Sequence, residues 1–276
     1  MNYPLGIQIL TEPRGLSTAE HVRLIAKTGW QGVTMKWNPA LSDEATEEAA
    51  RQGLFFQSFH APTNGIETIW ESGDAGEDIL RRMSACLCDC ADHGVPIMIV
   101  HPHMGFGDED AYSPDEIGLL RFGSLVELAE RKGVRLAFEN MEIRPYLRAL
   151  FQAFGDSEAV GFCLDTGHQM CYHKGYDFLS EFGSRLIHTH LNDNLGQRGD
   201  CATMYDDLHM VMGDGVIDWH NVMEKIRQTG YRDMLMCELN AHNKWDGHHE
   251  MDRYEAMGIE EFYAYAHKAA VHITSL

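Results

Sequence analysis

The stretch Arg135-Leu136-Ala137-Phe138-Glu139-Asn140-Met141 is a short apolar run that ends in a carboxylate, and Gly161-Phe162-Cys163-Leu164-Asp165 repeats this pattern. Runs that are apolar at nearly every position are typical of parallel strands covered by helices on both faces. Six further runs have the same character. The sequence therefore predicts eight strands, at residues 5–10, 32–37, 55–61, 97–103, 135–141, 161–165, 186–191 and 234–239.

Helical patterns with start and stop signals separate these strands. The clearest signals are a capping box at residues 17–20 with a closing Gly29, a second capping box at 113–116 with Pro114 at the first helical position and Gly133 at the end, an Asp218 cap with Gly230 at the end, and the segment 77–93. Eight strand–helix units in about 250 residues predict an α/β fold, a (β/α)8 TIM barrel that forms a single domain over residues 1–276.

A doubly wound open sheet is the alternative fold. Such a sheet usually carries a glycine-rich phosphate-binding turn after its first strand. Leu10-Thr11-Glu12-Pro13-Arg14-Gly15 is not a turn of this kind, so the barrel is the preferred prediction.

The charge of the chain disfavours a nucleic-acid partner. There are 22 Lys and Arg against 42 Asp and Glu, a formal net charge of −20, and a field of this sign repels a phosphate backbone. The longest apolar runs, such as 95–100, are far shorter than the roughly 20 residues of a membrane span. The N-terminal residues do not resemble a signal segment, so the expected compartment is the cytoplasm. The seven scattered cysteines are expected to be reduced thiols.

In a barrel of this type, catalytic residues lie at the C-terminal ends of the strands. From the third strand onward each predicted strand places an imidazole or a carboxylate there: His60, then His101 and His103, Glu139, Asp165 with His168 just beyond it, His188 and His190, and Glu238. Burying so many ionisable groups together is prohibitive unless a cation neutralises and bridges them.

Two Glu, one Asp and one His form a mixed oxygen and nitrogen ligand set. This set suits one divalent metal ion, namely Mn²⁺, Mg²⁺, Co²⁺ or Zn²⁺. Strand parity places His188 and His190 on the same face, with His190 nearer the barrel mouth. His190 is therefore the expected ligand, and His188 is expected beside it or in the core.

Five segments carry a further pattern: Phe138-Glu139-Asn140, Gly161-Phe162-Cys163-Leu164-Asp165-Thr166-Gly167-His168, His188-Thr189-His190-Leu191-Asn192-Asp193, Gly213-Asp214-Gly215-Val216-Ile217-Asp218-Trp219, and Cys237-Glu238. Together they resemble the xylose-isomerase-like TIM-barrel superfamily. That superfamily includes keto-sugar 3-epimerases, hydroxypyruvate and inosose isomerases, sugar dehydratases and the apurinic-site endonucleases. The resemblance implies that Glu139, Asp165, His190 and Glu238 bind one divalent metal, in agreement with the strand ends.

The endonucleases of this superfamily hold two further zinc ions. Candidates for their additional ligands are present: His60, His101, His168 and Asp207-Leu208-His209. Many sugar isomerases of the superfamily keep several of these histidines as contacts to substrate hydroxyl groups. Thr63 stands where the endonucleases usually carry an aromatic residue after His-Ala-Pro, and the net charge opposes DNA. A sugar enzyme is therefore favoured, with the zinc phosphodiesterase as an alternative.

The favoured function is that of a sugar isomerase or epimerase. A ketose or related keto-polyol would chelate the metal, which stabilises the charge of an enediolate, while Glu139 and Glu238 act as acid and base. Proton return to the opposite face gives epimerisation, return to the neighbouring carbon gives isomerisation, and loss of a β-hydroxyl gives dehydration. The sequence leaves these three outcomes open.

A small carbohydrate is thus the expected partner, with neither nucleic acid nor membrane, and a homo-oligomer is left open. The expected substrate contacts are His60, His101, His168, His209 and Lys36, and for Lys36 a structural ion pair is the other interpretation. The long connections 192–216 and 241–255 are expected to cover the barrel mouth as a lid.

Overall fold

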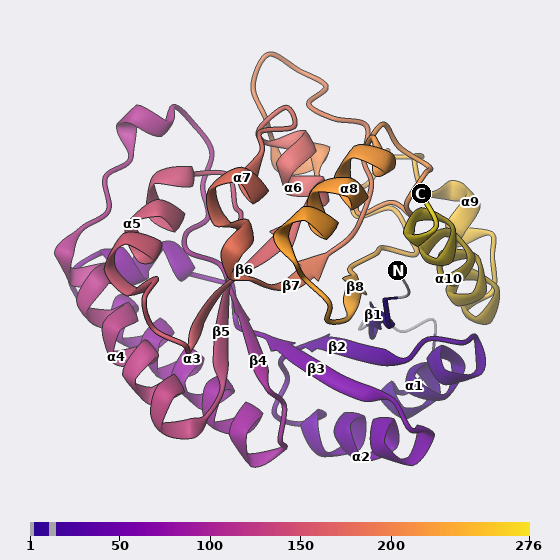
Figure 1. Ribbon diagram of the computed structural model, residues 1–276, viewed down its shortest axis with the longest axis horizontal. Helices are drawn as coiled ribbons and strands as arrows, with labels where there is room; N and C mark the ends of the chain where they lie inside the picture. Colours follow the sequence, from indigo (N-terminus) through magenta and orange to yellow (C-terminus); the bar gives the residue numbers. More distant parts are fainter. Residues whose placement is uncertain (1–2, 11–14) are drawn as a thin grey trace.

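The computed structural model describes residues 3–10 and 15–276. Its eight strands form one parallel sheet in the order β7-β6-β5-β4-β3-β2-β1-β8. The strands are β1 (Leu5–Gln8), β2 (Gly32–Lys36), β3 (Phe55–His60), β4 (Ile97–Val100), β5 (Arg135–Glu139), β6 (Val160–Asp165), β7 (Leu186–His190) and β8 (Leu235–Cys237). Figure 1 shows them in the middle of the molecule, with the helices around them.

The two ends of this sheet meet between β7 and β8. Leu191 bridges to Cys237 in parallel fashion, and the Leu191 N–H donates to the Met236 carbonyl oxygen at 2.8 Å. The Thr189 hydroxyl accepts from the Met236 N–H at 2.9 Å, so a side chain supplies part of the ladder. The sheet therefore closes into a (β/α)8 TIM barrel, and the prediction of this fold is confirmed. Of the stretch 10–15 used against the open sheet, residues 11–14 lie outside the described part of the chain.

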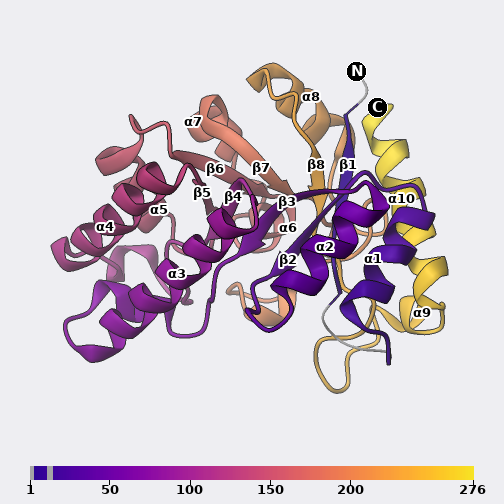
Figure 2. The same ribbon diagram turned by 90° about the horizontal axis from the view of Figure 1, so that it is seen from below.

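Helices follow most strands and cover the outside of the barrel. They are α1 (Thr18–Lys27), α2 (Ser42–Gln52), α3 (Asp74–Asp92), α4 (Glu116–Lys132), α5 (Arg144–Phe154), α6 (Thr166–Cys171), α7 (Phe178–Phe182), α8 (Trp219–Thr229), α9 (Asp252–Glu255) and α10 (Ile259–Thr274), with short 3₁₀ turns η1 (Ile66–Trp70), η2 (Glu109–Ala111), η3 (Gly183–Arg185) and η4 (Met204–Asp206). Figure 2 shows α10 beside α1, where Lys27 pairs with Glu260.

Most of the predicted caps are present. The capping box of Ser17 and Glu20 starts α1, and Asp218 caps α8. The second predicted box is wrong, because α4 starts two residues later than a Ser113 cap implies. The Asp115 carboxylate accepts from the Ile117 N–H at 2.8 Å, and this cap precedes the first helical residue, Glu116.

Side chains alternate between the inside and the outside of the barrel along each strand. Ile97, Ile99, Ala137 and Cys163 form a small interior cluster that is separate from the main core between sheet and helices. By the same parity Glu139 and Asp165 stand one layer above Ala137 and Cys163. The barrel register therefore directs the last residues of β5 and β6 into the mouth.

The predicted strand 97–103 is too long at its C-terminal end. Strand β4 ends at Val100, and Pro102 has no N–H to continue a ladder. The Pro102 carbonyl instead accepts from the Trp70 indole at 2.7 Å. His101 consequently follows the strand directly, whereas His103 lies in the connection.

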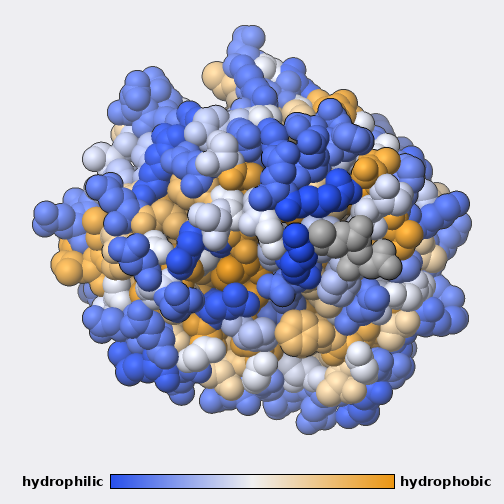
Figure 3. All heavy atoms as spheres, in the orientation of Figure 1, coloured by the Kyte–Doolittle hydropathy of each residue, from blue (hydrophilic) through white to orange (hydrophobic). Residues whose placement is uncertain are grey.

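The surface is mainly hydrophilic on the face drawn in Figure 3, with hydrophobic side chains gathered in smaller patches. All seven cysteines are free thiols, as predicted, and Cys86 and Cys90 are buried on the same side of α3. Among the described residues, no helix has the length and apolar character needed to cross a membrane.

Candidate metal centre and cavity

The residues predicted from the strand ends lie together at the C-terminal end of the barrel. Lys36, His60, Glu139, Asp165 and His190 are the last residues of β2, β3, β5, β6 and β7. His101 and Glu238 directly follow β4 and β8, His168 lies in α6, and His209 lies in the 192–216 connection. The barrel thus brings together all nine predicted site residues from distant parts of the chain.

Four of these residues form a compact group of possible metal ligands. One side-chain atom each from Glu139, Asp165, His190 and Glu238 lies within 4.8 Å of the others. His190 Nδ1 is 3.1 Å from Glu139 Oε1 and 3.0 Å from Glu238 Oε2. Neighbouring ligands of an ion with bonds of about 2.1 Å lie about 3.0 Å apart in an octahedron and about 3.4 Å apart in a tetrahedron. The donor set therefore fits a divalent cation.

The charges of this group also favour a cation. Burial opposes ionisation of Glu139, but His190 and His101 hold its pKa well below the usual value. Burial likewise opposes ionisation of Glu238, and His190 holds its pKa well below the usual value. Glu139 is fully buried, and among the described residues its Oε2 atom has the His101 imidazole 3.2 Å away but no well-aligned hydrogen bond. A buried, charged and partly unpartnered carboxylate is costly unless a positive group joins it.

Two asparagines hold Asp165 in place. The Asn140 amide accepts from the Asp165 N–H and donates to the Asp165 carbonyl, both at 2.8 Å, as a neighbouring strand would. Asn192 donates to Asp165 Oδ2 at 2.9 Å, while the other oxygen accepts from the His168 N–H at 2.7 Å and caps α6. Burial raises the pKa of Asp165. Four hydrogen bonds therefore fix the position and orientation of this residue at the end of β6.

A second possible ligand group shares Glu139 with the first. His60 and His101 have their Nε2 atoms 3.1 Å apart, and these lie 3.5 Å and 3.2 Å from Glu139 Oε2. His60 Nδ1 is 2.9 Å from the Ala61 carbonyl oxygen, a partner that requires the proton on Nδ1, so Nε2 carries the lone pair and faces His101. Burial lowers the pKa of His101 to about 4, so this imidazole is neutral near pH 7.

A third group shares Asp165 and consists of Asp165, His168 and His209. Asp207 adds a further carboxylate, with Oδ1 2.9 Å from His209 Nε2 and 3.6 Å from His168 Nε2. The Lys244 ammonium lies 3.0 Å from Asp207 Oδ2. Burial opposes ionisation of Asp207, but His209 and Lys244 hold its pKa well below the usual value.

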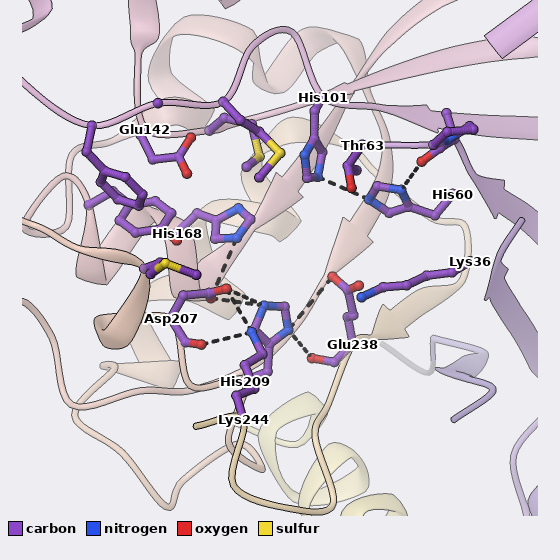
Figure 4. A pocket seen from close by; sticks show the side chains of 18 of the residues that line it. Lys36, His60, Thr63, His101, Glu142, His168, Asp207, His209, Glu238 and Lys244 are labelled. Atoms are coloured by element: carbon purple, nitrogen blue, oxygen red, sulfur yellow. Dashed lines mark hydrogen bonds and ion pairs between the residues drawn. The ribbon is translucent and has the colours of Figure 1, made fainter. Parts of the chain in front are cut away.

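A cavity of about 520 Å³ opens above these groups. Figure 4 shows Lys36 at one side of it, with the ammonium end directed toward Glu238, and Glu142 and His168 at the opposite side. Met204 and Asp207 line it from the 192–216 connection, and Lys244 and Trp245 from the 241–255 connection. Both predicted lid segments therefore form walls of the cavity, and their movement as a lid stays a prediction.

Two strand-end histidines, His103 and His188, are neither predicted site residues nor part of the cavity wall. His103 stacks on Tyr146 with ring centroids 4.0 Å apart. His188 lies deeper in the barrel, with Nε2 2.9 Å from the Ser58 hydroxyl and Nδ1 3.5 Å from Cys163 Sγ. His188 is thus part of the core below His190, as the parity argument allowed.

Glu142, Tyr172 and Lys244 also line the cavity, although they are not among the residues predicted from the sequence. All three lie in connections, where side chains do not alternate between two faces, so residue spacing does not predict their direction. The one signal in the sequence is that Glu142 comes shortly after the strand-end residue Glu139.

Comparisons with known proteins agree with this architecture. A sequence model of the xylose isomerase-like TIM barrel family matches residues 22–259. The uncharacterized protein y4fM of Sinorhizobium fredii is 26% identical, over 92% of this chain and 87% of its own length. The inosose dehydratase of Lacticaseibacillus casei is 25% identical, over 58% of this chain and 59% of its own length.

Two solved structures illustrate the shared fold. The IOLI protein, whose crystal structure has a binding zinc atom, has a TM-score of 0.74 and 16% identity, over 99% of this chain and 98% of its own. A D-tagatose 3-epimerase-like protein has a TM-score of 0.69 and 18% identity, over 97% of this chain and 99% of its own. At such identities these likenesses establish the fold.

Proposed function

Because the chain belongs to the xylose isomerase-like TIM barrel family, we propose that it is a divalent-metal-dependent sugar isomerase or epimerase. Its substrate is a ketose or a related keto-polyol, and the reaction passes through an enediolate. Glu139, Asp165, His190 and Glu238 hold one divalent ion. Two solved structures of the same fold, a D-psicose 3-epimerase and a D-tagatose 3-epimerase-like protein, support this class of substrate.

The observation that carries the proposal is the position of the two glutamates. Glu139 comes from β5 and Glu238 follows β8, and both carboxylates lie within 3.1 Å of the same nitrogen of His190. A proton transfer beside a carbonyl needs a base on one face of the substrate and an acid on the other face or at the neighbouring carbon. Two carboxylates from separate strands at one binding point supply this arrangement.

A divalent cation bound by the four ligands would polarise the substrate carbonyl and stabilise negative charge on its oxygen. Glu139 and Glu238 remove and return the proton. His168 and His209 contact substrate hydroxyl groups from one side of the cavity, and His60 and His101 from another. Lys36 offers a positive charge to a substrate oxygen beside Glu238. The buried floor of the cavity keeps bulk water away from the proton being moved.

Dehydration is the first alternative, because it starts from the same proton removal. The inosose dehydratase relative favours it, although that match covers 58% of the chain. A β-hydroxyl that leaves after proton removal diverts the enediolate to an unsaturated product. The identity of the product therefore separates the dehydratase from the isomerase and epimerase.

A zinc phosphodiesterase of the apurinic-site endonuclease type is the second alternative. Three of the possible ligand groups, linked through Glu139 and Asp165, favour it because they could hold more than one ion. The net charge of −20 opposes it, since a DNA backbone would be repelled. We therefore place it behind the sugar enzyme.

A metal-supplemented activity screen tests these proposals. Free and phosphorylated ketoses, inososes and other keto-sugars are incubated with the protein and Mn²⁺, Mg²⁺, Co²⁺ or Zn²⁺, with an abasic DNA duplex as control. We expect a new sugar isomer with at least one keto substrate and no strand cleavage. Cleavage of the duplex without sugar turnover would replace the sugar enzyme with the nuclease. A dehydrated sugar product would assign the dehydratase.

A further inference from the structure

A second cavity adjoins the one above the candidate metal centre. It measures about 600 Å³ and shares Phe106, Glu142 and Tyr172 with the first cavity, which measures about 520 Å³. Ligand pockets of about 300–1,000 Å³ hold a whole small molecule. The first cavity is therefore large enough for one sugar ring, and the second is additional space that a monosaccharide does not need.

Glu142 stands at the junction of the two cavities. Its side chain is more than nine-tenths buried, and its Oε2 atom has no hydrogen-bond partner among the described residues. Figure 4 shows its carboxyl group directed into the first cavity, on the side of His168. No ion pair joins it to a cationic side chain in the described part of the chain, and burial raises its pKa to about 7. A carboxyl group that keeps its proton can donate one hydrogen bond and accept another.

Aromatic rings line the route between the cavities. Tyr172 stacks against His168 with ring centroids 5.1 Å apart, and Phe106 packs edge-on against Tyr172 at 5.6 Å. Phe106 is also 39% exposed, so part of its ring is available to a ligand. An exposed aromatic ring beside a hydrogen-bonding carboxyl suits a sugar, which has apolar C–H faces and hydroxyl edges.

The charge of the second cavity argues against an anionic group. Asp108, Glu109 and Asp110 line it together with Arg144 and Lys174. Arg144 is already neutralised, because its guanidinium donates to both oxygens of Glu109, at 2.8 Å and 2.7 Å. The remaining acids outnumber the remaining base, and a phosphate or carboxylate on the ligand would be repelled.

We propose that the substrate is a neutral glycoside: its keto-sugar ring lies above the metal centre, its glycosidic substituent lies in the second cavity, and Glu142 bonds the substrate where the two meet. This inference rests on the proposed function for the reaction at the keto-sugar ring. The second cavity selects the size and charge of the substrate.

Binding tests the inference separately from turnover. Calorimetry on the metal-loaded protein compares an unoxidised neutral disaccharide with its monosaccharide and with the phosphate of that monosaccharide. We expect the disaccharide to bind at least about tenfold more tightly than the other two. Equal affinity for the disaccharide and the monosaccharide, or tighter binding of the phosphate, would overturn the inference whether or not the protein turns over sugars.

Turnover provides the second arm. The ratio of kcat/KM for a keto-disaccharide to that for the keto-monosaccharide is measured by solvent-deuterium exchange. Ala202 lines the second cavity, so Ala202→Trp fills it and should bring this ratio down to about one, whereas wild type keeps a ratio of about ten or more. Ala264→Trp on the exposed side of α10 is the matched control and should keep the wild-type ratio. An unchanged ratio in a folded Ala202→Trp protein contradicts the inference.

Glu142→Leu and Glu142→Gln provide a check that does not depend on filling the cavity. Leucine removes both hydrogen-bonding functions, while glutamine keeps a donor and an acceptor. Disaccharide affinity should fall about tenfold or more in the leucine variant and recover in the glutamine variant. Equal affinities in both variants and wild type contradict the role of Glu142. Absence of exchange with both keto substrates, despite preferential disaccharide binding, would instead remove the proposed function.

Discussion

Asp193 organises the connection that carries Asp207 and His209 to the cavity. This fully buried carboxylate accepts four hydrogen bonds. Its Oδ1 atom accepts from the N–H groups of Asn194 and Ile217 at 3.0 Å and 3.1 Å. Its Oδ2 atom accepts from the Gly213 N–H and the Trp219 indole at 2.9 Å and 2.8 Å. One side chain therefore joins both ends of the 192–216 connection to the start of α8.

The substitution Asp193→Asn keeps the shape and tests this role. An asparagine amide accepts through one oxygen only, so its NH₂ group must face two of the four N–H donors. Each buried donor left without an acceptor costs about 1–3 kcal/mol, which predicts a loss of about 2–6 kcal/mol in the free energy of unfolding. A domain is usually stable by about 5–15 kcal/mol, so this loss is a large share of the total.

Denaturant unfolding followed by circular dichroism measures the loss. Asp218→Asn is the matched control, because the exposed Asp218 caps α8 and asparagine is an equally good cap, so a change below about 0.5 kcal/mol is expected. Limited proteolysis should also cut the 192–216 connection sooner in Asp193→Asn. A destabilisation below about 1 kcal/mol, or one equal to that of the control, would refute the assignment of Asp193 as the anchor.

Three further predictions concern the site. Glu139→Gln and Glu238→Gln should each abolish sugar turnover while circular dichroism shows an intact fold, and near-normal turnover in both variants would end the assignment of these acids. Burial raises the pKa of Glu142 from 4.5 to about 7, so folding takes up a proton between these pH values and the stability of wild type falls as pH rises through this window. In metal-free protein, the free energy of unfolding of Glu142→Gln should therefore rise relative to that of wild type across this pH window, by about 3 kcal/mol at most. Unfolding curves at several pH values measure the difference. A difference that does not depend on pH would contradict the raised pKa of Glu142. A Cβ atom on Gly167 would clash with Asn192 Oδ1, so Gly167→Ala should displace the amide that holds Asp165 and weaken metal binding measured by calorimetry. Unchanged affinity would show that this contact is unimportant.

The fold and the centre of the site could be predicted because both follow from strand parity. An apolar run that ends in Glu139 or Asp165 specifies a strand and also the direction of its last side chain. Closure of the barrel then brings these strand ends together, although they are far apart in sequence. The predicted helix start at Ser113 was wrong because Ser113 and Asp115, two residues apart, can each cap the N-terminus of α4. Tertiary packing decides which of them does so.

The remaining cavity residues could not be predicted for a related reason. Glu142, Tyr172 and Lys244 lie in connections whose paths depend on tertiary contacts such as those of Asp193. His103 belongs to the strand-end groups but not to the predicted site residues, and in the structure it stacks on Tyr146. Its strand ends earlier than the apolar pattern suggests, because Pro102 interrupts the ladder.

Solvent-deuterium exchange tests the central claim, that the ion held by Glu139, Asp165, His190 and Glu238 supports proton transfer beside a carbonyl. The protein is incubated in D₂O with a keto-sugar, and NMR follows deuterium at the carbon next to the carbonyl. We predict exchange with metal-loaded protein, its loss after EDTA treatment and its return on addition of Mn²⁺ or Zn²⁺. Exchange that continues at the same rate in protein freed of metal would contradict the account.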